Sequence, residues 1–220
     1  MSYDGFEKYD RDVARSYDQD RQGEAHWHAE FAWLSAFAAQ HPLGRVLDVP
    51  VGTGRLLTAM RRAQQITGLD VSEDMLQVAR SAAAAAGHLP VELMRGDALD
   101  MPFSDAAFET VVCFRLTHLL PPELIPSLLA ELSRVCAARI LLQVYVAKET
   151  PPRPRFARWL ARLVRRVVPA RKLPWSHIRS YQYTWRFFED ALVGAGLTLT
   201  ARHRIDDYGA SSVEVLELAK

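Results

Sequence analysis

The sequence has little of several features that define whole classes of protein. Only two of its 220 residues are cysteine, Cys113 and Cys136, and both lie among apolar residues. We therefore expect buried thiols in a reducing compartment rather than a disulfide framework. No apolar run approaches the ~20 residues of a membrane span, and the polar, acidic start at residues 1–5 is unlike a secretory signal. These absences predict a cytoplasmic protein.

The sequence also lacks internal repeats and a strong charge imbalance. With 49% hydrophobic and 24% charged residues and a net charge of +1, its composition is that of an ordinary globular protein. Its length predicts one domain, 1–220, with a substantial core. Within it we expect an N-terminal lid (1–43), a central core (44–147), a basic helical cap insertion (148–180) and a closing helix with a strand pair (181–220).

What the sequence does contain is an alternation of strand-like and helix-like segments. Strands are predicted over 45–49, 65–69, 91–94, 110–114, 140–146, 197–202 and 213–218. Helices are predicted over 54–62, 73–86, 123–135 and 185–193. Ser72 is a plausible N-cap and Gly87 a plausible C′ residue of the second helix. The order predicts an α/β fold with a seven-stranded, mostly parallel sheet, an antiparallel edge strand and helices on both faces.

The most informative stretch runs from Val46 to Arg55. A strand ends at Asp48, and a turn containing Gly52 and Gly54 leads into a helical pattern. Backbone N–H groups and the positive end of a helix dipole at such a turn can hold an anionic or carboxylate-bearing ligand. The stretch therefore predicts a cofactor site.

Three acids stand at the carboxyl ends of the first three predicted strands: Asp48, Asp70 and Asp97. Open α/β sheets bind ligands at that edge. Asp70 follows Gly54 by 16 positions and suits ribose hydroxyls, Asp97 suits an exocyclic amine, and Asp48 suits an ammonium group or the turn itself. Any one of them could merely cap a helix or turn, but three at equivalent strand ends favour a ligand site.

A dinucleotide site is the first alternative. It prefers a third glycine where this chain has Leu57, and it has no standard role for an acid after the third strand. A nicotinamide-dependent oxidoreductase is thereby disfavoured.

The segments 47–54, 68–76, 96–98 and 108–112 resemble successive motifs of the class I S-adenosylmethionine-dependent methyltransferases that act on small molecules. The resemblance covers roughly 44–146 and the closing helix and strands. It implies a Rossmann-like fold, an enzyme, and S-adenosylmethionine as the cofactor.

The resemblance also implies roles for single residues. Gly52 and Gly54 would approach the methionine part of the cofactor, Asp70 the ribose, and Asp97 the adenine. Further cofactor contacts implied are Tyr17, Arg21, Asp48, Pro50, Val71, Met75, Ala98 and Phe114. The family usually has glycine and often cysteine where this chain has Pro50 and Val51, and proline removes one backbone donor from the turn.

In this family the segment after the fourth strand, here 113–120, faces the transferred methyl group. The Asp/Asn-Pro-Pro-aromatic motif typical of amine methylation on bases or glutamine is absent there, which disfavours amine methylation of nucleic acid and favours oxygen or carbon over nitrogen as the methylated atom. His118 is the candidate general base, or else a histidine that lines the pocket. Arg115 could hold an acidic substrate or the cofactor carboxylate, or lie in solvent at the strand end.

The amino-terminal segment predicts a helical lid. Residues 13–18 resemble the start of small-molecule members of the family, where the tyrosine, here Tyr17, covers the cofactor; Arg21 is a weaker candidate. Helical spacing further on links Phe31, Leu34, and Phe37 or Ala38. His26 and His28 point to different sides of a helix and have no acid or cysteine at ligand spacing, so no metal site is predicted.

The insertion is strongly basic. Between Lys148 and Lys172 there are nine basic residues and one acid. An apolar stripe recurs at helical spacing through Phe156, Trp159, Leu160, Leu163, Val164, Val167 and Val168. A cap helix over the pocket is the favoured interpretation. A peripheral membrane contact through 153–172 or recruitment of a phosphorylated, lipid-linked substrate is the alternative. The aromatic residues lie away from the arginines, which disfavours nucleic acid as a partner.

Together these features predict methyl transfer from S-adenosylmethionine to a small molecule or to a glycan or lipid head group, at oxygen. The alternative is a non-catalytic S-adenosylmethionine-binding or assembly subunit. The sequence identifies neither the acceptor nor the oligomeric state.

Overall fold

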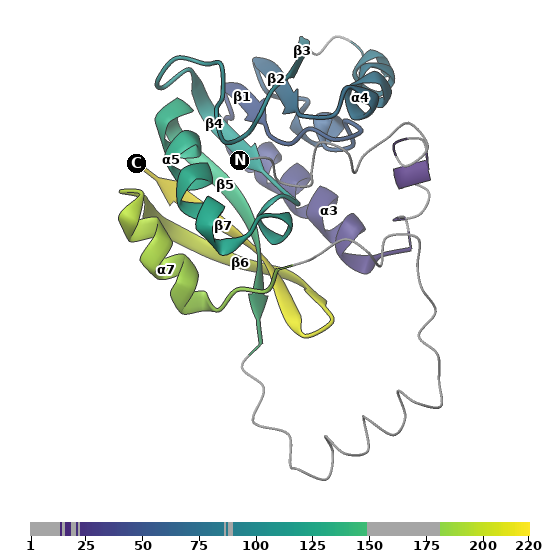
Figure 1. Ribbon diagram of the computed structural model, residues 1–220. Coiled ribbons are helices and arrows are strands. Elements are labelled where there is room, and N and C mark those ends of the chain that lie inside the picture. Colours follow the sequence, from purple (N-terminus) through teal and green to yellow (C-terminus); the bar gives the residue numbers. More distant parts are fainter. Residues whose placement is uncertain are drawn as a thin grey trace, which may run out of the picture.

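A seven-stranded sheet forms the centre of the structure (Figure 1), a computed structural model that describes residues 14, 16–18, 21, 23–85, 87, 90–148 and 181–220. The strands are β1 (Arg45–Asp48), β2 (Gln65–Asp70), β3 (Val91–Arg95), β4 (Phe108–Cys113), β5 (Cys136–Ala147), β6 (Thr198–Tyr208) and β7 (Ser211–Ala219). Their order is β3-β2-β1-β4-β5-β7-β6. The predicted insertion helix lies outside the described residues.

The first five strands are parallel, and the last two close the sheet as an antiparallel hairpin. β7 runs antiparallel to β5, and β6 forms the edge beyond it. The mostly parallel sheet with an antiparallel edge is thus confirmed. Both hairpin strands extend beyond their predicted ends, to Tyr208 and Ala219.

Helices cover both faces of the sheet, as predicted. The α-helices are α3 (Ala25–Gln40), α4 (Glu73–Ala85), α5 (Ile125–Val135) and α7 (Trp185–Gly194). The short 3₁₀ helices are η1 (Leu57–Met60), η2 (Thr117–Leu119) and η3 (Pro122–Leu124). One core lies under α5 and α7, and a second lies under α3, η1 and α4 (Figure 1). Both cysteines are buried free thiols.

The prediction of an α-helix over 54–62 is wrong, because the structure forms a 3₁₀ helix there. Hydrogen bonds here join residues three apart, from Leu57 N to Gly54 O and from Ala59 N to Leu56 O, which is the 3₁₀ pattern. Only η1 forms, a single short turn. The turn after β1 therefore lacks the dipole of a long helix.

The long N-terminal helix α3 is confirmed, but its buried face differs from the predicted stripe. Leu34, Phe37 and Ala38 are buried, whereas Phe31 is 37% exposed. The face is completed instead by His26, Trp27 and Glu30. A carboxylate on the buried side of a helix requires partners in the protein, and these lie at the site described below.

The strand order reverses at β1: β2 and β3 are added on one side of it, and β4 and β5 on the other. In open α/β sheets the crevice at such a switch point, outside the carboxyl ends of the strands, is where ligands bind. In the described part of the chain, no helix is long and apolar enough to cross a membrane.

Candidate active site

The turn after β1 contains one open glycine and one tightly packed glycine. Gly52 and Gly54 have φ values of +56° and +80°, which only glycine adopts freely. A side-chain carbon at Gly52 would meet no atom within 4 Å, so the backbone there borders open space. At Gly54 it would come within 3.1 Å of the Ala79 backbone in α4. Gly52 can therefore lie against a ligand, and Gly54 lets the turn pack on the helix.

The two departures from the family's turn are both accommodated. The Val49–Pro50 peptide bond is cis. The buried Val51 side chain packs on Gly68 of β2, where an added side-chain carbon would come within 2.8 Å of Val51 Cγ2. The glycine at residue 68 thus makes room for the branched side chain at residue 51.

Asp70, the last residue of β2, braces the glycine turn. Its Oδ2 accepts a hydrogen bond from Gly52 N (2.8 Å) and its Oδ1 accepts one from Ser72 N (2.9 Å). Burial raises the pKa of this carboxyl, and the hydrogen bonds from Ser72 and Gly52 oppose that rise. Ser72 Oγ in turn accepts from Met75 N (3.2 Å), which confirms Ser72 as the N-cap of α4.

Asp97 lies two residues beyond β3, next to this centre. Gly96 N donates to Asp70 O (3.0 Å), so the ends of β2 and β3 are joined. Asp97 Oδ1 accepts from Leu99 N (2.9 Å), an arrangement that closes its own turn. Ala98 beside it is buried, and Val71 O accepts from Arg95 Nε (3.1 Å).

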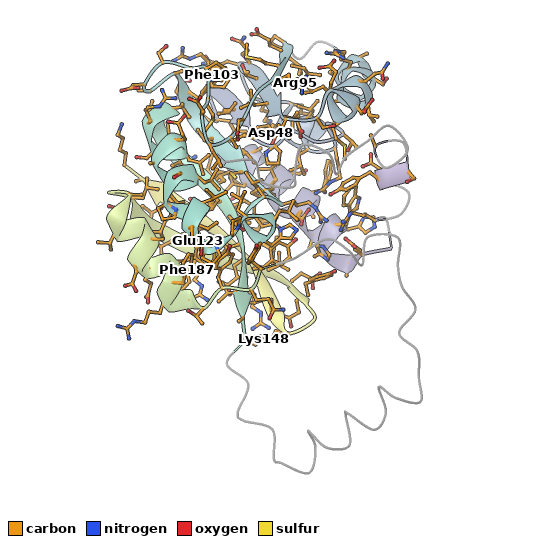
Figure 2. All side chains as sticks on the ribbon, in the orientation of Figure 1. Asp48, Arg95, Phe103, Glu123, Lys148 and Phe187 are labelled. Carbon is orange, nitrogen blue, oxygen red and sulfur yellow. The ribbon has the colours of Figure 1, made fainter. Side chains whose placement is uncertain are left out.

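Asp48, at the end of β1, is a buried acid in the interior of the molecule (Figure 2). Its Oδ2 makes no hydrogen bond among the residues that the structure describes. Burial raises the pKa of its carboxyl to about 8; Arg55 opposes this rise and Asp70 adds to it. At neutral pH the group is therefore mostly protonated.

This raised pKa makes stability depend on pH. In the unfolded chain the carboxyl loses its proton near pH 4, whereas in the folded chain it keeps the proton to about pH 8. The folded state is thus favoured below pH ~4, and the advantage declines as pH rises towards 8. Relative to D48N, the wild type should lose roughly 1 kcal/mol of unfolding free energy per pH unit between pH 5 and 7. Urea titrations of both proteins measure this; a difference that stays constant with pH would contradict it.

The amino-terminal residues lie against the same turn. Thr53 Oγ1 donates to Asp18 Oδ1 (2.8 Å). The Tyr17 ring lies 5.9 Å from the ring of Trp27, and the Arg21 guanidinium lies 4.9 Å from the centre of the Tyr17 ring. The segment that holds both predicted lid residues, Tyr17 and Arg21, therefore contacts the glycine turn through Asp18.

Arg115 is not a solvated strand-end residue. It belongs to a mostly buried cluster, the Glu30 network, which comprises Arg21, Glu24, Glu30, Arg55, Arg115 and Gln143. Glu30 Oε2 pairs with Arg55 Nη2, and Glu30 Oε1 accepts from Gln143 Nε2 (2.6 Å) and Arg115 Nη1 (3.3 Å). The Glu30 side chain is fully buried. One carboxylate thus joins α3 to the glycine turn, to the end of β4 and to β5.

Glu24 links the Glu30 network to a histidine. Its Oε2 lies 3.2 Å from His26 Nε2 and 3.6 Å from Arg115 Nη2. Burial alone would raise the pKa of the Glu24 carboxyl, but the hydrogen bond with His26 and the charges of Arg21 and Arg115 bring it down to about 2. Glu24 is therefore ionised at neutral pH.

His118, in η2, lies beyond the carboxyl end of β4. Its ring centre is 4.6 Å from that of Tyr145 in β5, and the His26 ring centre is 6.3 Å from that of Tyr145. Tyr208, from the tip of the hairpin, contacts His26 at 4.8 Å. Phe114 is buried, with its ring 6.4 Å from Trp33. His118 is thus held in a ring cluster next to the Glu30 network.

Most of the predicted residues therefore meet around the ends of β1, β2, β4 and β5. Sequence reasoning missed Glu30, Arg55, Gln143 and Tyr145. One signal was present: Arg55 directly follows Gly54. Among the described residues, no group of three or more histidine, cysteine or acidic side chains could hold a metal ion.

Comparison with known proteins gives this arrangement its class. Residues 46–139 match a family model described as a methyltransferase domain. Phosphatidylethanolamine N-methyltransferase of Cereibacter sphaeroides is 37% identical over 123 residues, which are 54% of this chain and 59% of that protein. Demethylmenaquinone methyltransferase of Symbiobacterium thermophilum is 36% identical over 110 residues, which are 45% and 42% of the two chains. The chain thus spans about half the length of these relatives.

A solved structure supports the fold. Magnesium protoporphyrin IX methyltransferase from Synechocystis PCC 6803 with bound SAH (S-adenosylhomocysteine) has a TM-score of 0.61 to this chain, at 17% identity. The match covers 100% of this chain and 89% of that one. Residues 46–139 thus match a methyltransferase domain, and the chain has the fold of a solved methyltransferase. The open backbone at Gly52 and the buried, unpaired Asp48 Oδ2 fit S-adenosylmethionine as its cofactor.

Proposed function

We propose that this chain transfers the methyl group of S-adenosylmethionine to an oxygen atom of a small molecule or of a glycan or lipid head group. The observation that carries the proposal is the open glycine turn beside a buried polar site at the ends of β4 and β5, with His118 next to it. The similarity to relatives named for phosphatidylethanolamine and demethylmenaquinone supports a small or lipid acceptor.

In this proposal each part of the cofactor has its own residues. Asp70 accepts from the ribose, Asp97 and Ala98 meet the adenine, and Met75 packs on the adenine ring. Asp48 and the two turn glycines, Gly52 and Gly54, receive the methionine end. Tyr17 and Arg21 cover the cofactor from the N-terminal side, and Pro50, Val71 and Phe114 complete the contacts.

S-adenosylmethionine supplies an electrophilic methyl group on a positively charged sulfur. The His118 imidazole accepts the proton of the acceptor hydroxyl while the carbon–oxygen bond forms and the carbon–sulfur bond breaks. Arg115 and Tyr145, at the ends of β4 and β5, orient the acceptor. Alignment of the acceptor oxygen with the methyl group supplies much of the remaining rate.

Replacing His118 tests the proposal. H118A should lower kcat on a hydroxyl acceptor by about 10²–10⁴-fold, because the proton must then leave without a positioned base. The affinity for S-adenosylhomocysteine should stay within about twofold. Methyl acceptors can be identified by incubating cell extracts with isotope-labelled cofactor and detecting labelled products by mass spectrometry. The control variant is H28A, because His28 lies on the exposed side of α3. Turnover that survives in H118A would remove the base role, and cofactor binding without turnover on any acceptor would favour a non-catalytic binder.

A second candidate is methylation of an amine on a lipid head group. The similarity to a phosphatidylethanolamine N-methyltransferase favours it, and the nine basic residues between Lys148 and Lys172 would suit an anionic membrane surface. Phosphatidylethanolamine vesicles belong in the same screen. Labelled product from them that does not depend on His118 would replace the oxygen proposal with this one.

A further inference from the structure

Near His118, one buried hydrogen-bond donor, Arg115 Nε, has no acceptor among the described residues, and the largely buried Tyr145 lies in the ring cluster beside it. The Tyr145 residue is 4% exposed, and its ring contacts those of His26, His118 and Tyr208. Arg115 Nε is buried and unbonded, although the other guanidinium nitrogens of Arg115 pair with Glu30 and Glu24. Buried donors without acceptors are costly and uncommon. Arg115 and Tyr145 lie near enough to perturb each other's pKa, so one ligand group could accept from both.

The charge around these donors indicates the sign of that group. The Glu30 network holds three guanidinium groups and two carboxylates, so one positive charge is in excess. Arg115 shares both of its carboxylates, Glu30 (3.3 Å) with Arg55 and Glu24 (3.6 Å) with Arg21, and so has no carboxylate of its own. The excess positive charge therefore falls at Arg115. A buried charge of this kind is stabilised by an opposite charge with good hydrogen bonds.

The backbone at Arg115 is also held in an uncommon conformation. Its φ is +62°, in the left-handed region that favours glycine. The Arg115 N–H donates to Gln143 Oε1 (2.7 Å), and this bond from β5 fixes the turn. Residues in such conformations cluster at ligand sites, where surrounding contacts hold them. Arginine thus occupies a position whose backbone conformation glycine would adopt with less strain.

We propose that Arg115 Nε and the Tyr145 hydroxyl form a binding site for an anionic oxygen group, a carboxylate or phosphate, carried by the methyl acceptor. The site rests on the proposed function, because it lies beside His118 at the ends of β4 and β5. The cofactor's own carboxylate has the same chemistry. Glu30, however, lies between Arg115 and the glycine turn: its Oε2 pairs with Arg55 of the turn, and its Oε1 faces Arg115 and Gln143.

The test uses inorganic phosphate as the probe on protein saturated with S-adenosylhomocysteine, so that the cofactor carboxylate is already in place. Wild type should bind phosphate at an ionic strength matched with chloride, as followed by calorimetry or thermal shift. Y145F should weaken that binding about tenfold or more, the effect of losing a hydrogen bond to a charged group. Because the hydroxyl bonds nothing in the described protein, Y145F should fold as the wild type does. Y208F, in the same ring cluster but half exposed, should change binding less than twofold.

Three results would overturn the proposal. Phosphate that binds only to cofactor-free protein would assign the donors to the cofactor carboxylate. Equal phosphate affinity in wild type and Y145F would remove Tyr145 from the site, and no phosphate binding at all would remove the site. Failure of the protein to bind S-adenosylhomocysteine would count against the proposed function instead. In that case, phosphate binding by the cofactor-free protein and by its Y145F variant would test the anion site independently of the proposed function.

Discussion

Replacing Glu30 with glutamine is expected to lower the free energy of unfolding by about 3–5 kcal/mol, because it leaves two buried arginines without their shared carboxylate. Glu30 is fully buried, and its two oxygens serve Arg55 and Arg115 separately. Glutamine keeps the shape of the side chain, so the loss reports charge rather than a cavity. Urea titration measures the change, and the melting temperature should fall by about 10 °C.

The matched control is E109Q. Glu109 pairs with Arg45 across an exposed contact of 3.0 Å, with both side chains more than 40% exposed. Pairs of this kind contribute less than about 1 kcal/mol. If E30Q were no more destabilising than E109Q, the Glu30 network would not be the polar centre that its geometry indicates.

Replacing Asp70 with alanine should weaken cofactor binding about 100-fold. The change removes the proposed ribose acceptor and also leaves Gly52 N and Ser72 N without their carboxylate, which loosens the turn that the cofactor meets. Hydrogen bonds to a charged group contribute roughly 1.5–3 kcal/mol each, and loss of two such bonds from the ribose hydroxyls weakens binding by about this factor. D70N keeps one acceptor oxygen and should cost about tenfold. Calorimetry with S-adenosylhomocysteine measures both.

The control for this experiment is an exposed acid from the neighbouring loop, whose removal changes the net charge by the same amount as D70A. Asp100 lies three residues beyond Asp97, and its side chain is exposed. D100A should leave the affinity within about twofold. An affinity in D70A within threefold of the wild type would show that neither the ribose contact nor the bracing of the turn depends on this carboxylate.

The sheet could be predicted from the sequence because its signals are local. Apolar runs mark the strands, and acids mark the ends of β1 and β2. The 3₁₀ turn at η1 could not be predicted, because Leu56, Leu57 and Met60 repeat at a spacing that suits an α-helix equally well. Phe31 was misplaced for the opposite reason: periodicity alone does not say that the buried face of α3 turns towards polar partners.

The Glu30 network lay beyond prediction because its contacts are distant in the chain. Glu30 meets Arg55, Arg115 and Gln143 across separations of 25, 85 and 113 residues. In the sequence, each of these residues looks like an ordinary polar surface residue, and only the fold brings them together. The roles of the single residues at the cofactor and acceptor sites stay predictions, which the variants above address.

The placement of Glu30 has a consequence for any attempt to shorten the protein. The stretch that matches the methyltransferase family, 46–139, includes Arg55 and Arg115 but neither Glu30, which precedes it, nor Gln143, which follows it. A fragment cut at those boundaries would hold two arginines in its interior with nothing to neutralise them. Any unit able to fold must therefore include at least α3 and β5, which extend past the region that sequence similarity alone would select.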